Sequence, residues 1–255
     1  MKLVTIIPAH LASIRLPRKI LMPIQGIPMI EHVRRRAKLS KKINKVFVAT
    51  GDLEIKNCVE SFGGEVLITK KKHINGTSRA SEAIKNIDCT HVLLLQGDEP
   101  LILPRHIDFF VKQISKDNLS DAWNSTANLK SKEELDISSF VKCAVNQNDQ
   151  IIYLFRETPA YSDFNYQKKY IKKILGIICF KKNVLINLMN KKKSKITLYQ
   201  SIEQMRLIEN SYKVKSVLLD KPLPSINVPG DLKKVLTELK NNKEQRNTLN
   251  KILEI

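Results

Sequence analysis

The stretch LVTIIPAHLASIRLPRK, residues 3–19, joins an apolar run to a polar loop. Residues 3–7 predict a buried β-strand, because a short apolar run bounded by a proline is typical of a core strand. The loop that follows carries Ser13, Arg15 and Lys19 with almost no apolar periodicity. Its spacing matches neither a Walker P-loop nor a GxGxxG turn, yet a guanidinium fork and a lysine ammonium together suit a triphosphate. We expect an anion site here, against the alternative of an exposed loop with incidental basic residues.

Strands and helices alternate through the first half of the chain. We predict strands at residues 3–7, 45–49, 65–68 and 91–95, with helices at 28–38, 54–62 and 78–87 between them. This alternation indicates βαβ units and a parallel sheet. Ligands of such sheets bind beyond the carboxyl ends of the strands, and the sequence is polar after the first, second and fourth strands. We expect these ends to line one crevice.

A second polar segment follows the most apolar of these strands. The sequence HVLLLQGDEP, residues 91–100, places Asp98 directly after the strand. A carboxylate at that edge is a suitable Mg²⁺ ligand, since this ion takes one or two carboxylates together with substrate phosphates and water. The alternative is a turn aspartate that bonds to its own backbone. Its position at the carboxyl edge of the sheet favours the metal.

The second half of the chain has a different pattern. Two strands at 140–146 and 150–155 flank a turn at 148–149, and further strands are predicted at 174–180 and 213–219. Helices are predicted at 183–189, at 198–209 and from Pro229 onward, with an amphipathic surface helix in the charged tail after Lys240. We expect one α/β domain over residues 1–255. Its nucleotide-binding half would be about 1–130, and its substrate-binding and dimerisation half about 131–255. The mixed, mostly parallel sheet would have helices on both faces and a smaller inserted lobe.

Composition narrows the class of function. The chain has 44 Lys and Arg against 25 Asp and Glu, a net charge of +19. Such a charge is compatible with nucleic-acid binding, but the lysines are scattered and aromatic residues make up only 6%, so stacking side chains are scarce. This pattern favours a solvated basic surface around an anionic small-molecule site.

Cysteine spacing and hydropathy exclude other classes. The four cysteines are far apart and form no CxxC pair, so the sequence predicts buried, reduced thiols and neither a zinc site nor a disulfide framework. No apolar run approaches the roughly 20 residues that a membrane span needs, and the N-terminus makes a poor signal peptide. We expect a cytoplasmic protein.

Several segments, in order along nearly the whole chain, resemble one family. They are IIPAHLASIRLPRK, GIPMIEHV, HINGTSRASEA, LLLQGDEPLI, FVKCAV, ILGI and IEQMRLIE. Together they resemble the 3-deoxy-manno-octulosonate (Kdo) cytidylyltransferase family. The opening and QGDEP motifs are shared with related nucleotide transferases, whereas GTSRASE and EQMR are more specific.

The resemblance implies a fold and a reaction. The fold would be that of the nucleotide-diphospho-sugar transferases, in a homodimer. The enzyme would transfer CMP from CTP to the anomeric hydroxyl of a 2-keto-3-deoxy sugar acid, with Mg²⁺ as cofactor and pyrophosphate as the other product. This reaction would serve the synthesis of cell-surface polysaccharide or lipopolysaccharide.

The resemblance also implies roles for single residues. Lys19 and Asp98 would be the catalytic residues, and Asp98 and Asn227 would hold the metal. The nucleotide would be bound by Ala9, His10, Ser13, Arg15, Lys19, Asn75, Gly76, Thr77 and Gln96. The sugar acid would be bound by Arg79, Arg156, Glu203 and Gln204.

Some positions depart from the family pattern. His10 stands for an arginine, Ser78 and Gln200 for acidic residues, and Asn227 for the second metal carboxylate; Ile174 and Ile178 replace a histidine and a tyrosine of the sugar pocket. These departures leave open a different sugar acid or a catalytically impaired descendant that binds nucleotide. For Asn227 the alternative to metal binding is capping of the helix after Pro229.

Overall fold

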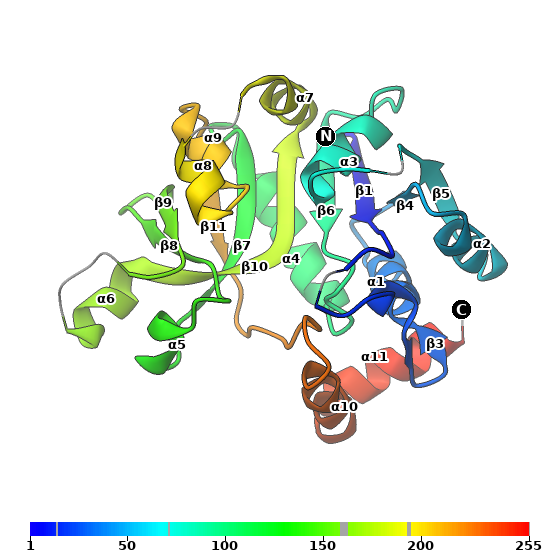
Figure 1. Cartoon of the computed structure of the whole chain (residues 1–255). Coiled ribbons are helices and arrows are strands. Elements are labelled where there is room, and N and C mark those ends of the chain that lie inside the picture. The colour runs from blue at the N-terminus through cyan, green and yellow to red at the C-terminus, as the bar shows by residue number, and fades with distance from the viewer. Residues whose placement is uncertain (14, 71, 159–162, 193–194, 255) are drawn as a thin grey trace. The chain divides into compact units, whose positions relative to one another are not determined.

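The computed structural model describes residues 1–13, 15–70, 72–158, 163–192 and 195–254 (Figure 1). Its contacts divide the chain into two units, Met1–Lys112 with Leu223–Ile255 and Gln113–Pro222. The second unit is an insertion, because the chain leaves the first unit after Lys112 and returns to it at Leu223.

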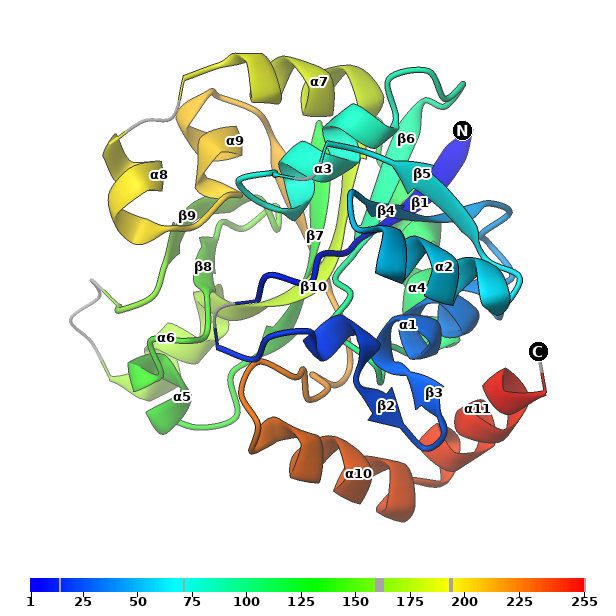
Figure 2. The same ribbon diagram turned by 45° about the vertical axis from the view of Figure 1, so that its right-hand side comes forward.

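The first unit contains a parallel sheet. Its strands, in the order β6-β1-β4-β5, are β6 (His91–Leu95), β1 (Leu3–Pro8), β4 (Val46–Thr50) and β5 (Glu65–Ile68), and Figure 2 shows them side by side. Strands β1, β4 and β6 are almost wholly buried, as expected of parallel strands covered on both faces. The four strands predicted from the first half of the sequence are confirmed to within one residue at each end.

Helices of the first unit pack on this sheet. They are α1 (Met29–Lys38), which contacts β4, α2 (Leu53–Ser61), which contacts β4 and β5, and α3 (Gly76–Ala83), which contacts β1. The short strands β2 (Pro23–Ile24) and β3 (Ile27–Pro28) form a hairpin between the 3₁₀ turn η1 (Lys19–Leu21) and α1.

Helix α4 (Pro104–Ile114) was not predicted, although its strong apolar face is visible in the sequence. Helix α3 begins two residues before its predicted start, because the Asn75 side chain caps it by accepting from the Ser78 N–H at 2.8 Å.

Two helices late in the chain complete the first unit. Helix α10 (Asp231–Asn241) packs beside α11 (Lys243–Leu253), and α11 also contacts α1 (Figure 1). The predicted amphipathic surface helix of the tail is confirmed, because α11 buries one face against α1 and exposes the other. Arg36 of α1 donates to the Gln245 side chain at 2.8 Å, and burial lowers the pKa of this arginine to about 9. A buried guanidinium needs acceptors, and α11 supplies one.

The second unit is built on a mixed sheet. Its strands are β7 (Ala122–Asn128), β8 (Lys142–Val145), β9 (Ile151–Phe155), β10 (Ile171–Lys181) and β11 (Val214–Leu218). Strand β7 pairs in parallel with β11 and antiparallel with β10, and β8 pairs antiparallel with both β9 and β10. The predicted β8–β9 pair, β10 and β11 are confirmed. Strand β7 was missed, because its centre reads Asn-Ser-Thr and lacks the apolar pattern of a core strand.

One predicted helix of the second unit is wrong. The helices here are α5 (Glu133–Asp136), α6 (Phe164–Tyr170), α7 (Lys182–Asn190), α8 (Lys195–Gln200) and α9 (Met205–Glu209). The sequence predicted a single helix over 198–209, but the structure breaks it after Gln200. Ser201 has φ +52°, a left-handed conformation that cannot continue a right-handed helix.

The cysteines and hydrophobic segments agree with the composition. All four cysteines are free; three are buried, and Cys58 is half-buried. Burial raises the pKa of the Cys143 thiol to about 12, which keeps it protonated. Across the described ranges, no helix has both the length and the apolar character to cross a membrane.

Candidate active site

The opening loop after β1 is tied to the segment that follows β4. The Leu11 N–H donates to Asp52 Oδ2 at 3.0 Å, and Arg18 forms an ion pair with Glu54. Asp52 lies two residues after the end of β4, where a carboxylate can meet the end of the neighbouring strand β1. The sequence showed a polar strand end here but gave Asp52 no role.

Lys19 joins the opening loop to the end of β6. Its Nζ donates to Asp98 Oδ2 at 2.7 Å and to the Ile226 carbonyl at 2.9 Å. The Ile226 N–H in turn donates to the Asp98 carbonyl at 2.9 Å, so the segment around residue 226 lies directly against Asp98. Gly97 lets the end of β6 lie close to the residue after Lys19, because a Cβ there would lie 2.6 Å from Cδ1 of Ile20.

Arg15 makes the second contact between the loop and this late segment. Its Nη2 donates to Asn227 Oδ1 at 3.1 Å, while Asn227 Nδ2 donates to Ser225 Oγ at 3.0 Å. The capping alternative for Asn227 is wrong, because Asp231 Oδ2 accepts from the backbone N–H groups of Asn227 and Val228, at 3.0 and 3.1 Å. The amide oxygen of Asn227 is therefore available to the opening loop.

These contacts bring oxygen atoms together that could serve a hard cation. Asp98 Oδ2, the Ile226 carbonyl and Asn227 Oδ1 each accept from a cationic side chain of the opening loop. Among the residues described, no cluster of three or more His, Cys, Asp or Glu could hold a metal by itself. This donor set fits Mg²⁺, which prefers oxygen ligands and completes its shell with water and substrate phosphates.

The start of α3 reaches the end of β1. A Cβ on Gly76 would lie 2.9 Å from Cγ of Pro8, so only glycine allows so close an approach. The amino end of a helix carries partial positive charge. Asn75 is committed to capping, Thr77 is buried, and Gln96 after β6 is half-buried. The buried Ala9 extends β1 by donating its N–H to the Ala49 carbonyl at 2.9 Å.

His10 and Arg79 lie in different environments, since His10 is exposed and Arg79 is buried. Arg79 is buried and donates to Thr69 Oγ1 at 2.6 Å and to the Lys70 carbonyl at 3.1 Å. Loss of hydration, followed by the charge of Arg79, lowers the pKa of His10 below its ordinary value of 6.5. His10 is thus uncharged at neutral pH. Ser78, which stands for an acidic residue of the family, donates its hydroxyl to the Asn75 carbonyl at 2.9 Å.

The second unit brings together three of the predicted sugar-acid residues. Arg156, just after β9, donates to the carbonyls of Ser138 at 3.0 Å and Ser201 at 3.4 Å. The break between α8 and α9, which starts at Ser201, also carries Glu203 and Gln204. The fourth predicted residue, Arg79, belongs to the first unit. The Gln200 side chain falls outside the described part of the chain.

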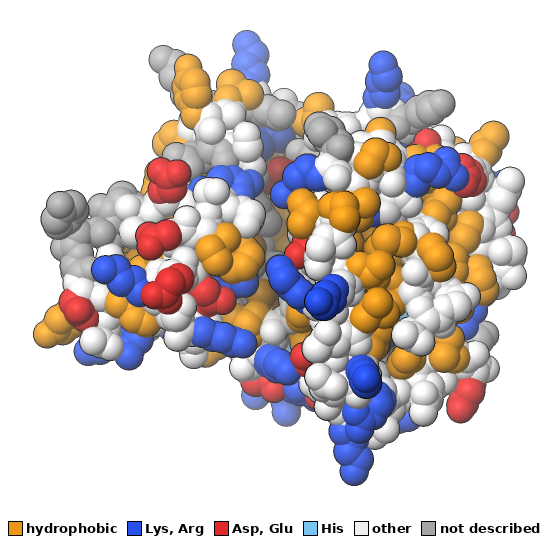
Figure 3. All heavy atoms as spheres, turned by 60° about the horizontal axis from the view of Figure 1, so that its bottom comes forward, with side chains coloured by type: hydrophobic (Ala, Val, Ile, Leu, Met, Phe, Trp, Pro, Cys, Tyr) orange, Lys and Arg blue, Asp and Glu red, His pale blue; other side chains and the backbone are white. Residues whose placement is uncertain are grey.

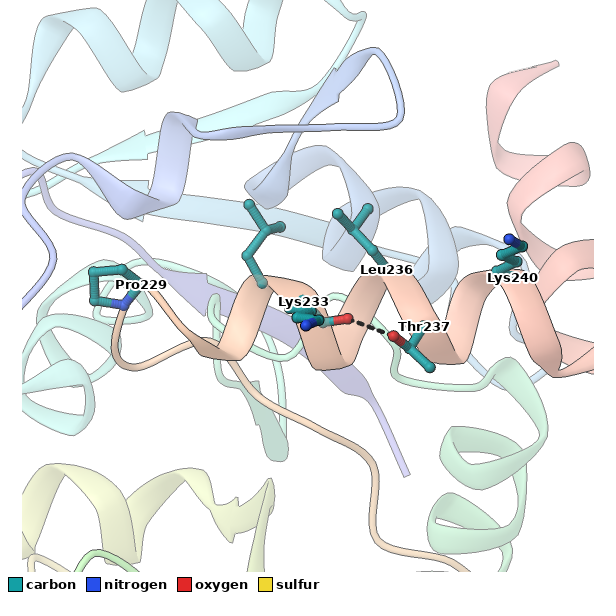
Figure 4. Close-up of a pocket in the computed structure, with 6 residues that line it drawn as sticks. Pro229, Lys233, Leu236, Thr237 and Lys240 are labelled. Carbon is teal, nitrogen blue, oxygen red and sulfur yellow. Dashed lines mark hydrogen bonds between the residues drawn. The ribbon is translucent and has the colours of Figure 1, made fainter.

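A separate pocket runs along α10 in the first unit (Figure 4). It is lined by Pro229, Leu232, Lys233, Leu236, Thr237 and Lys240. The Thr237 hydroxyl donates to the Lys233 carbonyl at 2.8 Å, so it is used within the helix. Figure 3 brings this side forward and shows hydrophobic side chains next to Lys and Arg side chains. With no acid, histidine or thiol in its lining, this pocket is not the site of the chemistry.

Comparison with known proteins gives one consistent result. The family model described as "Cytidylyltransferase" matches residues 4–216. The 3-deoxy-manno-octulosonate cytidylyltransferase of Chlorobium limicola is 34% identical, over 91% of this chain and 95% of its own. The enzyme of that name from Escherichia coli is 31% identical, over 92% of this chain and 94% of its own.

Solved structures agree with the sequence relatives. A CMP:2-keto-3-deoxy-manno-octonic acid synthetase complexed with CTP superposes with a TM-score of 0.88 at 31% identity, covering 94% of this chain and 99% of its own. A 4-diphosphocytidyl-2C-methyl-D-erythritol synthase from Anaerococcus prevotii matches at a TM-score of 0.66 and 16% identity, over 94% of this chain and 99% of its own. The second likeness shows the fold alone. The predicted nucleotide-diphospho-sugar transferase fold is confirmed.

Proposed function

The chain belongs to the 3-deoxy-manno-octulosonate cytidylyltransferase family, and we propose that it transfers CMP from CTP to the anomeric hydroxyl of 3-deoxy-manno-octulosonate. The observation that carries the proposal is the cationic loop after β1, whose Lys19 and Arg15 converge on Asp98 and Asn227. A triphosphate that enters this loop meets two positive side chains and the amino end of α3.

The chemistry needs charge neutralisation and positioning. The anomeric oxygen would attack the α-phosphorus while the pyrophosphate leaves on the opposite side. Arg15 and Lys19 would bind the phosphates and offset the charge that develops on the leaving group. Holding the two substrates in line removes the entropy of a bimolecular encounter from the barrier. Arg156, Glu203 and Gln204 would hold the sugar acid, with the arginine on its carboxylate.

Mg²⁺ is the cofactor that we propose for this site. Asp98 and Asn227 would hold it, and when bound it would withdraw electron density from phosphate oxygens. Asp98 Oδ2 and Asn227 Oδ1 accept from Lys19 and Arg15. The incoming triphosphate offers these cations stronger acceptors, so nucleotide binding would free both oxygens. We therefore expect the metal and CTP to bind together.

The alternatives have less support. The Chlorobium limicola and Escherichia coli relatives, which each match over nine-tenths of the chain, are both named for the Kdo acid, which does not favour a different sugar acid. An impaired descendant is also not favoured, because Asn227 still offers an oxygen beside the Lys19–Asp98 pair. A nucleic-acid surface is not favoured either, because the lysines are scattered along the sequence and aromatic residues make up only 6% of it.

Three further properties complete the proposal. We propose a homodimer, a cytoplasmic location and a place in lipopolysaccharide or other cell-surface polysaccharide synthesis. Each rests on the resemblance to the family. No membrane insertion is needed, since CTP and the sugar acid are both water-soluble small molecules.

The test is a pyrophosphate-release assay with CTP, 3-deoxy-manno-octulosonate and Mg²⁺. We expect release that requires all three components, with equimolar formation of the CMP-sugar. A thermal-shift series with CTP and ATP runs in parallel, because a ligand of the folded state raises its stability. Stabilisation by CTP without turnover would identify an impaired descendant. Equal stabilisation by ATP and CTP would reject a cytidine site.

A further inference from the structure

The centre of strand β7 is polar although it is fully buried. Asn124, Ser125 and Thr126 follow one another inside the sheet of the second unit, and none of the three is exposed to solvent. Burying polar groups is unfavourable unless each finds a hydrogen-bond partner. The partners of these three side chains show what the polar segment does.

Two of the side chains support an irregularity in the neighbouring strand. The pairing of β10 with β7 shifts register between Ile174 and Ile178. Ser125 Oγ donates to the Ile177 carbonyl at 3.0 Å and accepts from the Ile177 N–H at 3.2 Å. Asn124 Nδ2 donates to the Leu175 carbonyl at 3.0 Å. Side chains of β7 thus replace the backbone partners that the bulge removes.

Asn124 also contacts the break between α8 and α9. Its Oδ1 accepts from Gln204 Nε2 at 3.4 Å. The orientation of the Asn124 amide is fixed, because its nitrogen serves the carbonyls of Ser125 at 2.9 Å and Leu175. Its oxygen therefore faces Gln204, and this oxygen selects the nitrogen end of the Gln204 amide.

We propose that Asn124 is a positioning residue for the sugar acid, acting through Gln204. One N–H of the Gln204 amide is held by Asn124, which turns Gln204 Oε1 away from Asn124 and toward the substrate. Gln204 Oε1 then accepts a hydrogen bond from a sugar hydroxyl. The inference rests on the proposed function, which places Gln204 at the sugar acid. Asn124 joins Gln204 to the bulge at Leu175–Ile177, which lies between Ile174 and Ile178.

The experiment separates positioning from general support of the strand. Asn124→Leu removes the polar atoms but keeps a branched side chain. We expect it to raise the KM for 3-deoxy-manno-octulosonate about tenfold and to leave the KM for CTP unchanged. A site that binds a substrate hydroxyl loses much of its affinity when the side chain that pairs with this hydroxyl, here Gln204, is misplaced. Thr126→Val is the matched control. It loses the equally buried 2.8 Å bond to Ser216, which does not involve Gln204, and both KM values should stay at the wild-type level.

A double-mutant cycle tests whether Asn124 acts through Gln204. We expect Gln204→Leu to raise the sugar-acid KM by itself, and Asn124→Leu to add nothing in its presence, because coupled residues are not additive. Additive losses would overturn the proposal, as would equal KM values for Asn124→Leu and Thr126→Val. Asn124→Ser, which is too short to reach Gln204, replaces the leucine variant if that protein does not fold. If the wild type turns over but the variants give these contradicting results, only the role of Asn124 is rejected. If the wild type itself does not turn over, the proposed function is rejected as well.

Discussion

The two units build their candidate sites from different kinds of interaction. In the first unit the opening loop is held by charged contacts, of which the Lys19–Asp98 pair at 2.7 Å is the most buried. In the second unit Asn124 and Ser125 are held by neutral hydrogen bonds inside the sheet. A partly exposed ion pair can exchange partners when a charged ligand arrives, at little net loss. A buried amide has no such freedom, so it keeps a fixed orientation.

The largest effect is expected at Asp98. Asp98→Asn removes the carboxylate that Lys19 pairs with and that would hold the metal, so we expect kcat to fall about 1,000-fold. Because the residue is at a strand end, the melting temperature should change little. The assay is pyrophosphate release, with Asp88→Asn as the control, since Asp88 forms an exposed pair with Lys2 in the same unit. Full activity of Asp98→Asn would remove this residue from the mechanism.

The next largest effect is expected at a buried histidine of the first unit, whose hydrogen bond cannot exchange partners with a ligand. Buried His32 of α1 has its ring Nε2 2.7 Å from the Ile24 carbonyl, and burial lowers its pKa to about 4. The folded state disfavours the protonated ring, so stability is complete above pH 6.5 and is lost as the pH falls toward 4. The loss should reach about 3 kcal/mol at 1.36 kcal/mol per pKa unit.

Urea denaturation of the wild type and of His32→Gln at pH 8, 6, 5 and 4 measures this loss. The glutamine variant lacks the titrating ring, so its free energy of unfolding should decline less over the same range. Parallel curves for the two proteins would show that His32 does not govern the pH dependence.

A smaller effect is expected at Asn227, whose uncharged amide oxygen accepts a hydrogen bond from Arg15. Asn227→Asp adds a second carboxylate beside Asp98, and we expect the Mg²⁺ concentration for half-maximal activity to fall about tenfold. Arg15 keeps its acceptor in this variant. A Mg²⁺ titration at fixed CTP decides the matter, and superimposable titrations would contradict a metal role for this position.

The smallest effect is expected at His10. Its lowered pKa leaves it neutral at pH 7.5, so His10→Arg adds a permanent charge to the loop and should tighten CTP binding about threefold by calorimetry. The difference in CTP affinity between wild type and His10→Arg should narrow as the pH is lowered and the wild-type ring takes up a proton, below its ordinary pKa of 6.5. His10→Gln, neutral at every pH, should match the wild type at pH 7.5 and bind CTP more weakly than the wild type once its ring is protonated. A difference between wild type and His10→Arg that stays constant over the whole pH range of the folded protein would contradict a titrating histidine.

The sequence predicted the first unit better than the second, for a physical reason. Parallel strands covered on both faces are continuous apolar runs, and the charges at their ends are easy to recognise. The strand β1 and the position of Asp98 beyond the end of β6 were therefore both predictable. Strand β7 was missed because Asn124–Thr126 are polar, and the partners of Asn124 and Ser125 in β10 and in the break before α9 are more than 50 residues away. Ser201 shows the same limit, since nothing in its local sequence indicates a left-handed break.

Within the first unit, the sequence also did not predict the roles of backbone groups or of residues whose partners are far away in the chain. The Ile226 carbonyl binds Lys19 from 207 positions away, and a carbonyl has no signature in a sequence. Asp52 was part of a recognisably polar strand end, but its bond to the Leu11 N–H depends on how the loop folds back.

The distance between Lys19 and Ile226 has a consequence for biosynthesis. On the ribosome the opening loop emerges early, whereas the backbone that completes its contacts is made only after the whole inserted unit, Gln113–Pro222. Domains usually fold as they emerge from the ribosome. Because the inserted unit is continuous in the chain, it can fold before the final segment of the first unit has been made. A nascent chain released before residue 226 would carry the loop, Asp98 and the inserted sheet, yet Lys19 would lack one of its two acceptors. Translation that stops before residue 226 therefore yields an incomplete site, and the site can be completed only after the inserted unit has been made.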